Sequence, residues 1–166
     1  RSAIQLLERE LRMAGSGWGT IPVEGSDSGI PAQWLAVRAG PGAGANDSLS
    51  ILLGTGAATT LRDAMPNSSA ILKVVSTTGF QDGDLCVVTN GASAHLFQVT
   101  QVSSPPENLQ HNPSSSWNVP GGHSNWPAGG YLTGDGVYEV ASVTYRVDLS
   151  SFGRPTLVRQ AAGGSP

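Results

Sequence analysis

The sequence has little charge and few aromatic side chains. Charged residues make up 13% and aromatic residues 6% of its 166 positions. Lys73 is the only lysine, and nine basic against twelve acidic residues give a formal net charge of -3. Binding to nucleic acid phosphates requires clustered Lys and Arg side chains. The composition therefore gives no support for a nucleic acid partner.

Cysteine and long apolar runs are also scarce. Cys86 is the single cysteine, which excludes a disulfide within the chain. It lies in the apolar run 85–88, where a buried and inert thiol is the expected form. No run of eighteen apolar residues is present, so the sequence shows no segment of the length and character of a transmembrane helix.

Glycine and proline are abundant by contrast, with 22 Gly and 11 Pro in the chain. Many turn-forming residues and few charges favour short strands joined by turns over a helical bundle. A length of 166 residues suits one domain that buries its own hydrophobic core. We therefore expect a β-rich domain.

One amphipathic helix is predicted at residues 1–15. Its apolar residues recur at three- and four-residue spacing, at Ile4, Leu7, Leu11 and Ala14. Gly15 ends the pattern, as glycine commonly does after a helix. Because the pattern is already regular at residue 3, we interpret the segment as the end of a longer helix. Ile4, Leu7 and Leu11 are expected to pack against strands, while the first turn stands clear of the head.

Two pairs of antiparallel strands are predicted from alternation. Residues 85–89 and 95–102 flank Asn90-Gly91, a dipeptide typical of hairpin turns. Residues 137–147 and 155–160 form the second pair. Both faces of 95–102 mix apolar and polar residues, so this strand is expected between two layers or near a sheet edge.

Three further segments give weaker signals. Residues 33–37 form a strand-like run. Leu61 and Met65 are spaced for one helical turn. Residues 103–136 read as a long irregular insertion, rich in Pro, Ser, Asn and Gly, that carries Trp117 and Trp126. Loops of this length in compact domains are usually functional or disordered, and two tryptophans favour order. We expect an ordered flap that packs on the sheet or on a neighbouring molecule.

Candidate catalytic and cofactor-binding residues are not found. The sequence has no Gly-x-Ser-x-Gly elbow, and Cys86 lies within a strand, so a nucleophilic triad is not predicted. Gly54-Thr55-Gly56 and Gly15-Ser16-Gly17 lack the following helix and lysine of a phosphate-binding loop. We predict no catalytic residue and no cofactor site.

A metal site is considered and not predicted. Asp82 and Asp84 flank a glycine, and His95, His111 and His123 are the three histidines. However, Asp-Gly-Asp is ordinary turn chemistry, in which the carboxylates accept hydrogen bonds from backbone amides. The histidines also lack the spacing of a ligand set. No metal ligand is therefore assigned.

A ligand or partner surface is a further possibility. Trp117, Trp126 and Tyr131 lie in or beside the flap and can stack on a glycan or on a partner surface if exposed. The alternative is that they anchor the flap to the sheet, and this interpretation is favoured.

The opening helix, the central block and the last two predicted strands carry a resemblance to a known family. Residues 4–15 (IQLLERELRMAG), followed by a loop with glycines and aromatics, resemble the exit from the long helix of type IV pilus minor pilins of the PilW kind. Residues 80–102, with the turn Gln81-Asp82-Gly83-Asp84, are similar to the head domain of that family. Residues 138–147 and 156–159 match its late hairpin.

The resemblance implies an α+β, pilin-like fold. Residues 1–15 would be the C-terminal part of the long pilin helix, packed on a mainly antiparallel β-sheet head with long loops at 16–166. The function implied is structural rather than enzymatic, at the initiation or tip of a pilus. Assembly would use the helix residues, and specificity would come from head loops such as 103–136.

The resemblance also implies partners and a location. The partners would be other pilin subunits and the inner membrane, which is reached through an N-terminal helix segment that this chain lacks. The protein would belong to a bacterial cell envelope or pilus, with its head in the periplasm before assembly.

Two other classes remain open. The chain can be a β-rich extracellular module for carbohydrate or surface adhesion, which burial of both Trp117 and Trp126 would oppose. It can also be an enzyme, which would be favoured by a pocket that joins His95 or His123 to a carboxylate.

Overall fold

The computed structural model describes residues 3–27, 30–41, 47–69, 71–113, 115–123, 125–149 and 153–162. These residues form a single helix, α1 (Ala3–Met13), and eleven strands. The strands are β1 (Val23–Asp27), β2 (Ile30–Trp34), β3 (Val37–Pro41), β4 (Asp47–Thr60), β5 (Leu72–Lys73), β6 (Leu85–Thr89), β7 (Ala94–Gln98), β8 (Gln101–Ser103), β9 (Asn108–Gln110), β10 (Gly136–Asp148) and β11 (Thr156–Ala162).

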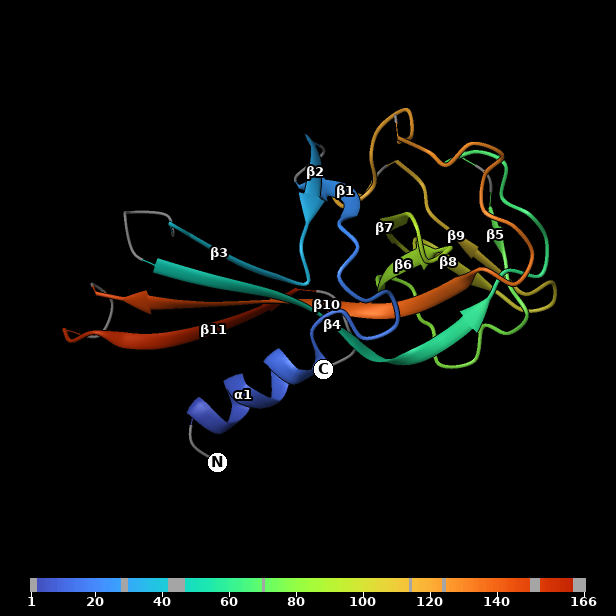
Figure 1. Ribbon diagram of the computed structural model, residues 1–166. Helices are drawn as coiled ribbons and strands as arrows, with labels where there is room; N and C mark the ends of the chain where they lie inside the picture. Colours follow the sequence, from blue (N-terminus) through green and yellow to red (C-terminus); the bar gives the residue numbers. More distant parts are fainter. Residues whose placement is uncertain are drawn as a thin grey trace.

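The strands form one large and one small sheet (Figure 1). The large sheet has the order β2-β1-β7-β6-β10-β4-β3, with β11 also paired to β10, and the small sheet has the order β5-β9-β8. β1 and β7 pair in parallel, whereas the other strand pairs are antiparallel. The large sheet curls into a nearly closed, barrel-like shape.

The predicted α+β, pilin-like fold is therefore wrong. The described residues are mainly β, and the single helix among them, of 11 residues, lies at the margin of the head (Figure 1). None of the described helical structure has the length and apolar character needed to cross a membrane. The alternation of apolar and polar residues predicted too few strand residues. β4, for example, continues through residues 54–60, which are small or polar and do not alternate.

β4 and β10 are the longest strands and join the two halves of the molecule. In the barrel-like half, residues 136–140 of β10 pair with β6. Further along, residues 142–148 of β10 pair with β11. We call β3, β11 and the parts of β4 and β10 that pair with them (residues 47–51 and 142–148) the arm. The arm extends away from the barrel-like half (Figure 1).

The predicted hairpin of β6 and β7 is confirmed, and both strands are buried on both faces. Cys86 and Val88 point into one apolar cluster, beneath the small sheet, whereas Leu85 and Val87 point into another. Cys86 is fully buried, as predicted, and burial raises the pKa of its thiol. The strand predicted at 95–102 is divided, because residues 101–103 form β8 in the small sheet, and the position between two layers is confirmed for β7 alone.

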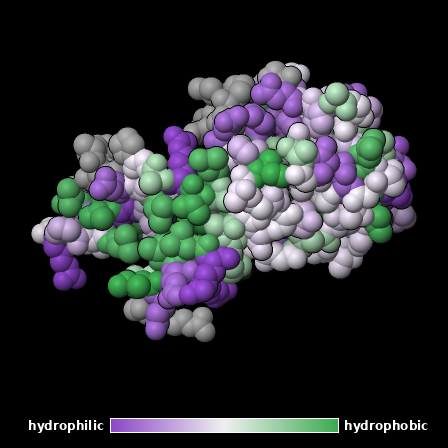
Figure 2. Space-filling model, in the orientation of Figure 1, coloured by the Kyte–Doolittle hydropathy of each residue, from purple (hydrophilic) through white to green (hydrophobic). Residues whose placement is uncertain are grey.

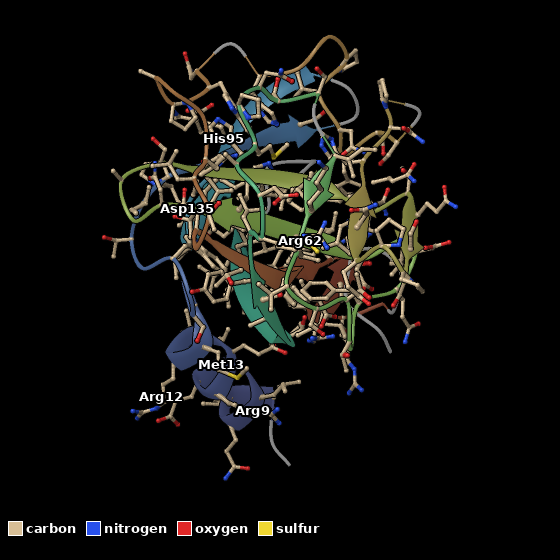
Figure 3. All side chains as sticks on the ribbon, turned by 90° about the vertical axis from the view of Figure 1, so that its right-hand side faces the viewer. Arg9, Arg12, Met13, Arg62, His95 and Asp135 are labelled. Carbon is tan, nitrogen blue, oxygen red and sulfur yellow. The ribbon has the colours of Figure 1, made fainter. Side chains whose placement is uncertain are left out.

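α1 packs on one face of the arm. Leu7, Met13 and Ala14 contact a cluster that contains Ile51 and Val143. The prediction that Ile4, Leu7 and Leu11 pack against strands is confirmed for Leu7. It is wrong for Ile4 and Leu11, which are 75% and 38% exposed. Figure 3 shows α1 projecting from the head, with Arg9 and Arg12 directed away from it.

Gly15 ends the helix, as predicted, in a left-handed conformation with φ of +72°. Its N–H donates to the carbonyl of Leu52 on β4 at 3.1 Å. A Cβ at this position would lie 2.2 Å from the carbonyl oxygen of Gly19, a distance that no side chain tolerates. Glycine is thus required where the chain turns from α1 into the head.

Three local predictions are wrong for reasons of long-range pairing. Leu61 and Met65 form no helical turn, because they make β-bridges to Val74 and Tyr131. The flap at 103–136 is not wholly irregular, since it contains β9, which pairs with β8. The strand expected around residues 33–37 is divided between β2 and β3, which pair with β1 and β4.

Candidate functional site

A buried carboxylate fixes α1 to the arm. Glu10 is only 6% exposed. The hydroxyl of Tyr145 on β10 donates to its Oε2 at 2.7 Å. Nη2 of Arg159 on β11 donates to its Oε1 at 2.7 Å. Burial and the bond to Glu10 raise the pKa of Tyr145, and the bond to Glu10 raises that of Arg159. α1 is therefore held in a defined orientation on two strands.

Sequence reasoning missed Glu10, although its spacing carried a signal. Glu10 follows Leu7 by three residues and precedes Ala14 by four, so it lies on the apolar side of the helix. An acidic residue at such a position requires a partner when the helix packs. Arg159, the partner in β11, is far away in the sequence and could not be assigned without the fold.

The arm has one polar and one apolar face. Residues paired across antiparallel strands point to the same side, and the register aligns Arg38, Ser50 and Thr144 on one face. The hydroxyls of Ser50 and Thr144 lie 3.1 Å apart there. The opposite face carries Ile51 and Val143, on which α1 packs.

α1 leaves much of this apolar face uncovered among the described residues. Val37 pairs with Ile51, and Val147 pairs with Leu157, so all four lie on the same face as the helix. Val37, Val147 and Leu157 are 41%, 36% and 45% exposed. Hydrophobic residues accordingly gather on the arm beside α1 in Figure 2. Ile4 and Leu11 on α1 are exposed as well. We call these five residues the exposed apolar surface: Ile4, Leu11, Val37, Val147 and Leu157.

A second feature is the flap, which is fastened to the sheet at several points. Asn118, buried to 3% exposure, accepts the N–H of Gln98 at 2.7 Å and donates to its carbonyl at 3.0 Å. The backbones of Met65 and Tyr131 exchange hydrogen bonds of 2.8 and 3.0 Å. The expectation that the flap is ordered and packs on the sheet is therefore confirmed for its described residues.

Trp117, Trp126 and Tyr131, which were considered as a ligand or partner surface, lie in different surroundings. Trp117 is half-buried and contacts Trp34, with ring centroids 5.4 Å apart. Tyr131 is completely buried, and Trp126, half-buried, meets it edge-to-face at 4.9 Å. Trp117 and Tyr131 thus fasten the flap, whereas Trp126 contributes to a cavity.

This cavity, of about 200 Å³, lies between β7 and the flap. His95 of β7 is 1% exposed, and its Nδ1 lies 2.6 Å from the hydroxyl oxygen of Tyr131. Its ring is 4.6 Å from that of His123 and 4.7 Å from that of Trp126. Figure 3 places His95 in the upper part of the barrel-like half. The other lining residues are Met65, Ser68, Ser69, Val88, Phe97, His111, Asn112, Pro113, Asn118, Val119, Gly121 and Gly122.

Two of the three histidines that line the cavity, His95 and His123, are uncharged at neutral pH. Burial, with a smaller effect of His123, lowers the pKa of His95 to about 3. Burial, with a smaller effect of His111, lowers that of His123 to about 4. Asp, Glu, Lys and Arg are absent from the described lining residues. The histidine–carboxylate pair that would have favoured an enzyme is therefore not found in this part of the structure.

The aspartates around Gly83 are turn residues, as predicted. A carboxylate oxygen of Asp84 accepts the N–H of Gln81, and one of Asp82 accepts the N–H of Val102, both at 2.7 Å. In the described parts of the chain, no group of three or more His, Cys, Asp or Glu residues is arranged to hold a metal ion.

Comparison with known proteins gives no relative. No protein-family model matches the chain, and neither the curated proteins nor the solved structures contain a significant match.

Proposed function

We propose that the protein is a structural subunit of a bacterial type IV pilus, a minor pilin, and that the exposed apolar surface contacts neighbouring subunits. The observation that carries the proposal is the position of α1. The helix is fixed to the arm through Glu10, yet 75% of Ile4 on its first turn is exposed.

A helix that only covered the sheet would bury its apolar residues. α1 instead leaves Ile4 and Leu11 exposed, and the arm adds Val37, Val147 and Leu157 on the same side. Large apolar side chains exposed on neighbouring elements can mark protein–protein contacts, and helices pack on such surfaces through interdigitating side chains. Helices of other pilin subunits are therefore the proposed partners.

The proposal is supported by the helix and by the sequence resemblance of residues 4–15 and 80–102. It does not depend on the fold predicted from that resemblance, which the barrel-like head replaces. On this proposal the head lies in the periplasm before assembly and the flap contributes contacts specific to this subunit.

The substitution Ile4→Asp tests the proposal in the full-length protein, in the bacterium that encodes it. A charge in an apolar contact is unfavourable, so we expect incorporation into sheared pili to fall about tenfold, the effect of a loss of ~1.4 kcal/mol in binding. The folded head should be unaffected because Ile4 is 75% exposed. The measurement is the ratio of the protein in the sheared fraction to that in whole cells.

Val75→Asp is the matched control, since Val75 is 61% exposed and lies on the barrel-like half, outside α1 and the arm. This variant should be incorporated normally. Normal incorporation of the Ile4→Asp protein, or equal losses for both variants, would contradict the role of the exposed apolar surface.

A further inference from the structure

We propose that a strap over the cavity, residues 119–123 and 125–130, opens when His95 and His123 become protonated. This inference goes beyond the assembly role, because the strap lies on the barrel-like half, away from α1 and the arm (Figure 1). The strap carries His123 and Trp126, whose rings lie 4.6 and 4.7 Å from the ring of His95 on β7. Acid would thus uncover groups that the folded protein hides at neutral pH.

Two firm attachments flank the strap. On one side Asn118, 3% exposed, accepts the N–H of Gln98 at 2.7 Å and donates to its carbonyl at 3.0 Å. Asn118 also donates to the carbonyl of Asn112 at 2.8 Å. On the other side Tyr131 is completely buried, and its backbone exchanges two hydrogen bonds with that of Met65. We expect both attachments to hold when the strap moves.

The strap itself is held by single hydrogen bonds. The N–H of His123 donates to Ser68 Oγ at 3.0 Å, and its imidazole bonds the backbone of Leu96. The indole Nε1 of Trp126 donates to the carbonyl of Met65 at 3.4 Å. Glycines with positive φ lie near both ends of the strap: Gly121, Gly122, Gly129 and Gly130. Glycine permits backbone rotations that other residues resist, so these positions are suited to act as hinges.

The closed strap does not accommodate a charged His95. The residue is 1% exposed, and its Nε2 has no hydrogen-bond partner among the described residues. Its Nδ1 lies 2.6 Å from the hydroxyl oxygen of Tyr131. A protonated imidazole donates from both nitrogens, so the proton on Nε2 would be buried without an acceptor, which is unfavourable. Opening of the strap would give this proton access to water.

The surroundings of the two rings oppose a positive charge. Protonated His95 and His123 would repel each other across 4.6 Å. The other titratable groups that face them are Tyr131, His111 and Glu24. Burial raises the pKa of Tyr131, so its phenol stays neutral. Glu24 on β1 favours the charged form of His123, but by less than burial opposes it, and the pKa of His123 is lowered to about 4.

The direction of the pH effect follows from proton binding. In the open form both imidazoles reach water and titrate near the ordinary pKa of 6.5, whereas in the closed form the pKa values are about 3 and about 4. The closed form is therefore fully favoured above pH 6.5, and opening increases as the pH falls. Both histidines together raise the opening equilibrium about 500-fold between pH 7 and pH 5.

The test is hydrogen exchange of the purified chain between pH 7 and pH 5, followed by NMR and corrected for the intrinsic exchange rate at each pH. The strap protons are the N–H of His123 and the indole N–H of Trp126, and the attachment protons are the N–H of Gln98 and of Tyr131. We expect the protection of the strap protons to fall about 500-fold and to stay below that of the attachment protons. Low urea should leave strap exchange unchanged, because local opening exposes little surface.

His123→Gln should reduce the fall to about 25-fold, because one of the two histidines is removed. His111→Gln is the matched control and should retain the full fall, since the ring of His111 packs on that of Phe97, 5.5 Å away. The proposal is overturned if strap and attachment protons are equally protected, if the protection of the strap protons does not change with pH, or if both variants behave alike. These outcomes do not depend on pilus assembly.

Discussion

Replacing Arg159 with alanine is expected to lower the free energy of unfolding by about 3 kcal/mol at pH 7. The substitution leaves the Glu10 carboxylate, 6% exposed, with only the hydroxyl of Tyr145 as a partner. Breaking a buried ion pair by removing one partner costs about 3–5 kcal/mol, and the 38% exposure of the Arg159 side chain places this pair at the lower end. Urea denaturation followed by circular dichroism measures the change.

Arg12→Ala is the matched control. Arg12 and Glu8 are also 2.7 Å apart, but their side chains are 76% and 59% exposed. Exposed pairs at this helical spacing contribute only about 0.3–0.5 kcal/mol. Equal losses for Arg159→Ala and Arg12→Ala would show that burial of Glu10 does not set the strength of the attachment of α1.

Acidification from pH 7 to pH 5 is expected to lower the free energy of unfolding by about 4 kcal/mol through two histidines. His95 and His123 have pKa values of about 3 and about 4 in the folded protein, against 6.5 for an ordinary histidine. Between these values the unfolded chain binds protons that the folded chain does not. Stability is therefore complete above pH 6.5 and declines below it, by up to ~1.4 kcal/mol per pH unit for each histidine.

The measurement is the unfolding free energy as a function of pH between 7 and 5. Other titratable groups close to these rings are Tyr131, His111 and Glu24. His95→Gln should reduce the slope by about half, because one of the two histidines is removed. An unchanged slope in this variant would contradict the assignment, whatever its stability at pH 7.

Elements with strong local patterns could be predicted from the sequence. α1 followed from three- and four-residue spacing, and the hairpin of β6 and β7 followed from alternation around Asn90-Gly91. β10 and β11 were found in the same way. In each of these elements, the apolar residues that the core needs are close together along the chain.

The barrel-like fold could not be predicted because distant pairing creates it. Gly54 and Ala58 give no strand pattern, yet β4 continues through them because β10 offers its hydrogen-bonding groups along the whole length. Met65 likewise joins Tyr131, far away in the sequence, and not a helical turn. Pairing with a long, buried strand therefore determines the conformation of a segment even where its local sequence propensity favours another one.

The attachment of α1 through Glu10 and the cavity beside β7 differ in how far the sequence could indicate them. Glu10 could have been recognised by its place on the apolar side of α1, although not its partner. The cavity had no sequence signal, because His95 and His123 meet only after the flap folds back over β7. Their separation along the chain matches no ligand or catalytic motif, so spacing alone could not indicate a site.

The most direct test of the assembly role is photo-crosslinking from position 4. On this proposal, a benzoylphenylalanine in place of Ile4, in the full-length protein within the cells that encode it, should form covalent products with pilin subunits. The same residue in place of Val75, which is also exposed but lies outside α1 and the arm, should not. Absence of pilin products at position 4, or equal yields at the two positions, would contradict the proposal that the exposed apolar surface joins this protein to its neighbours.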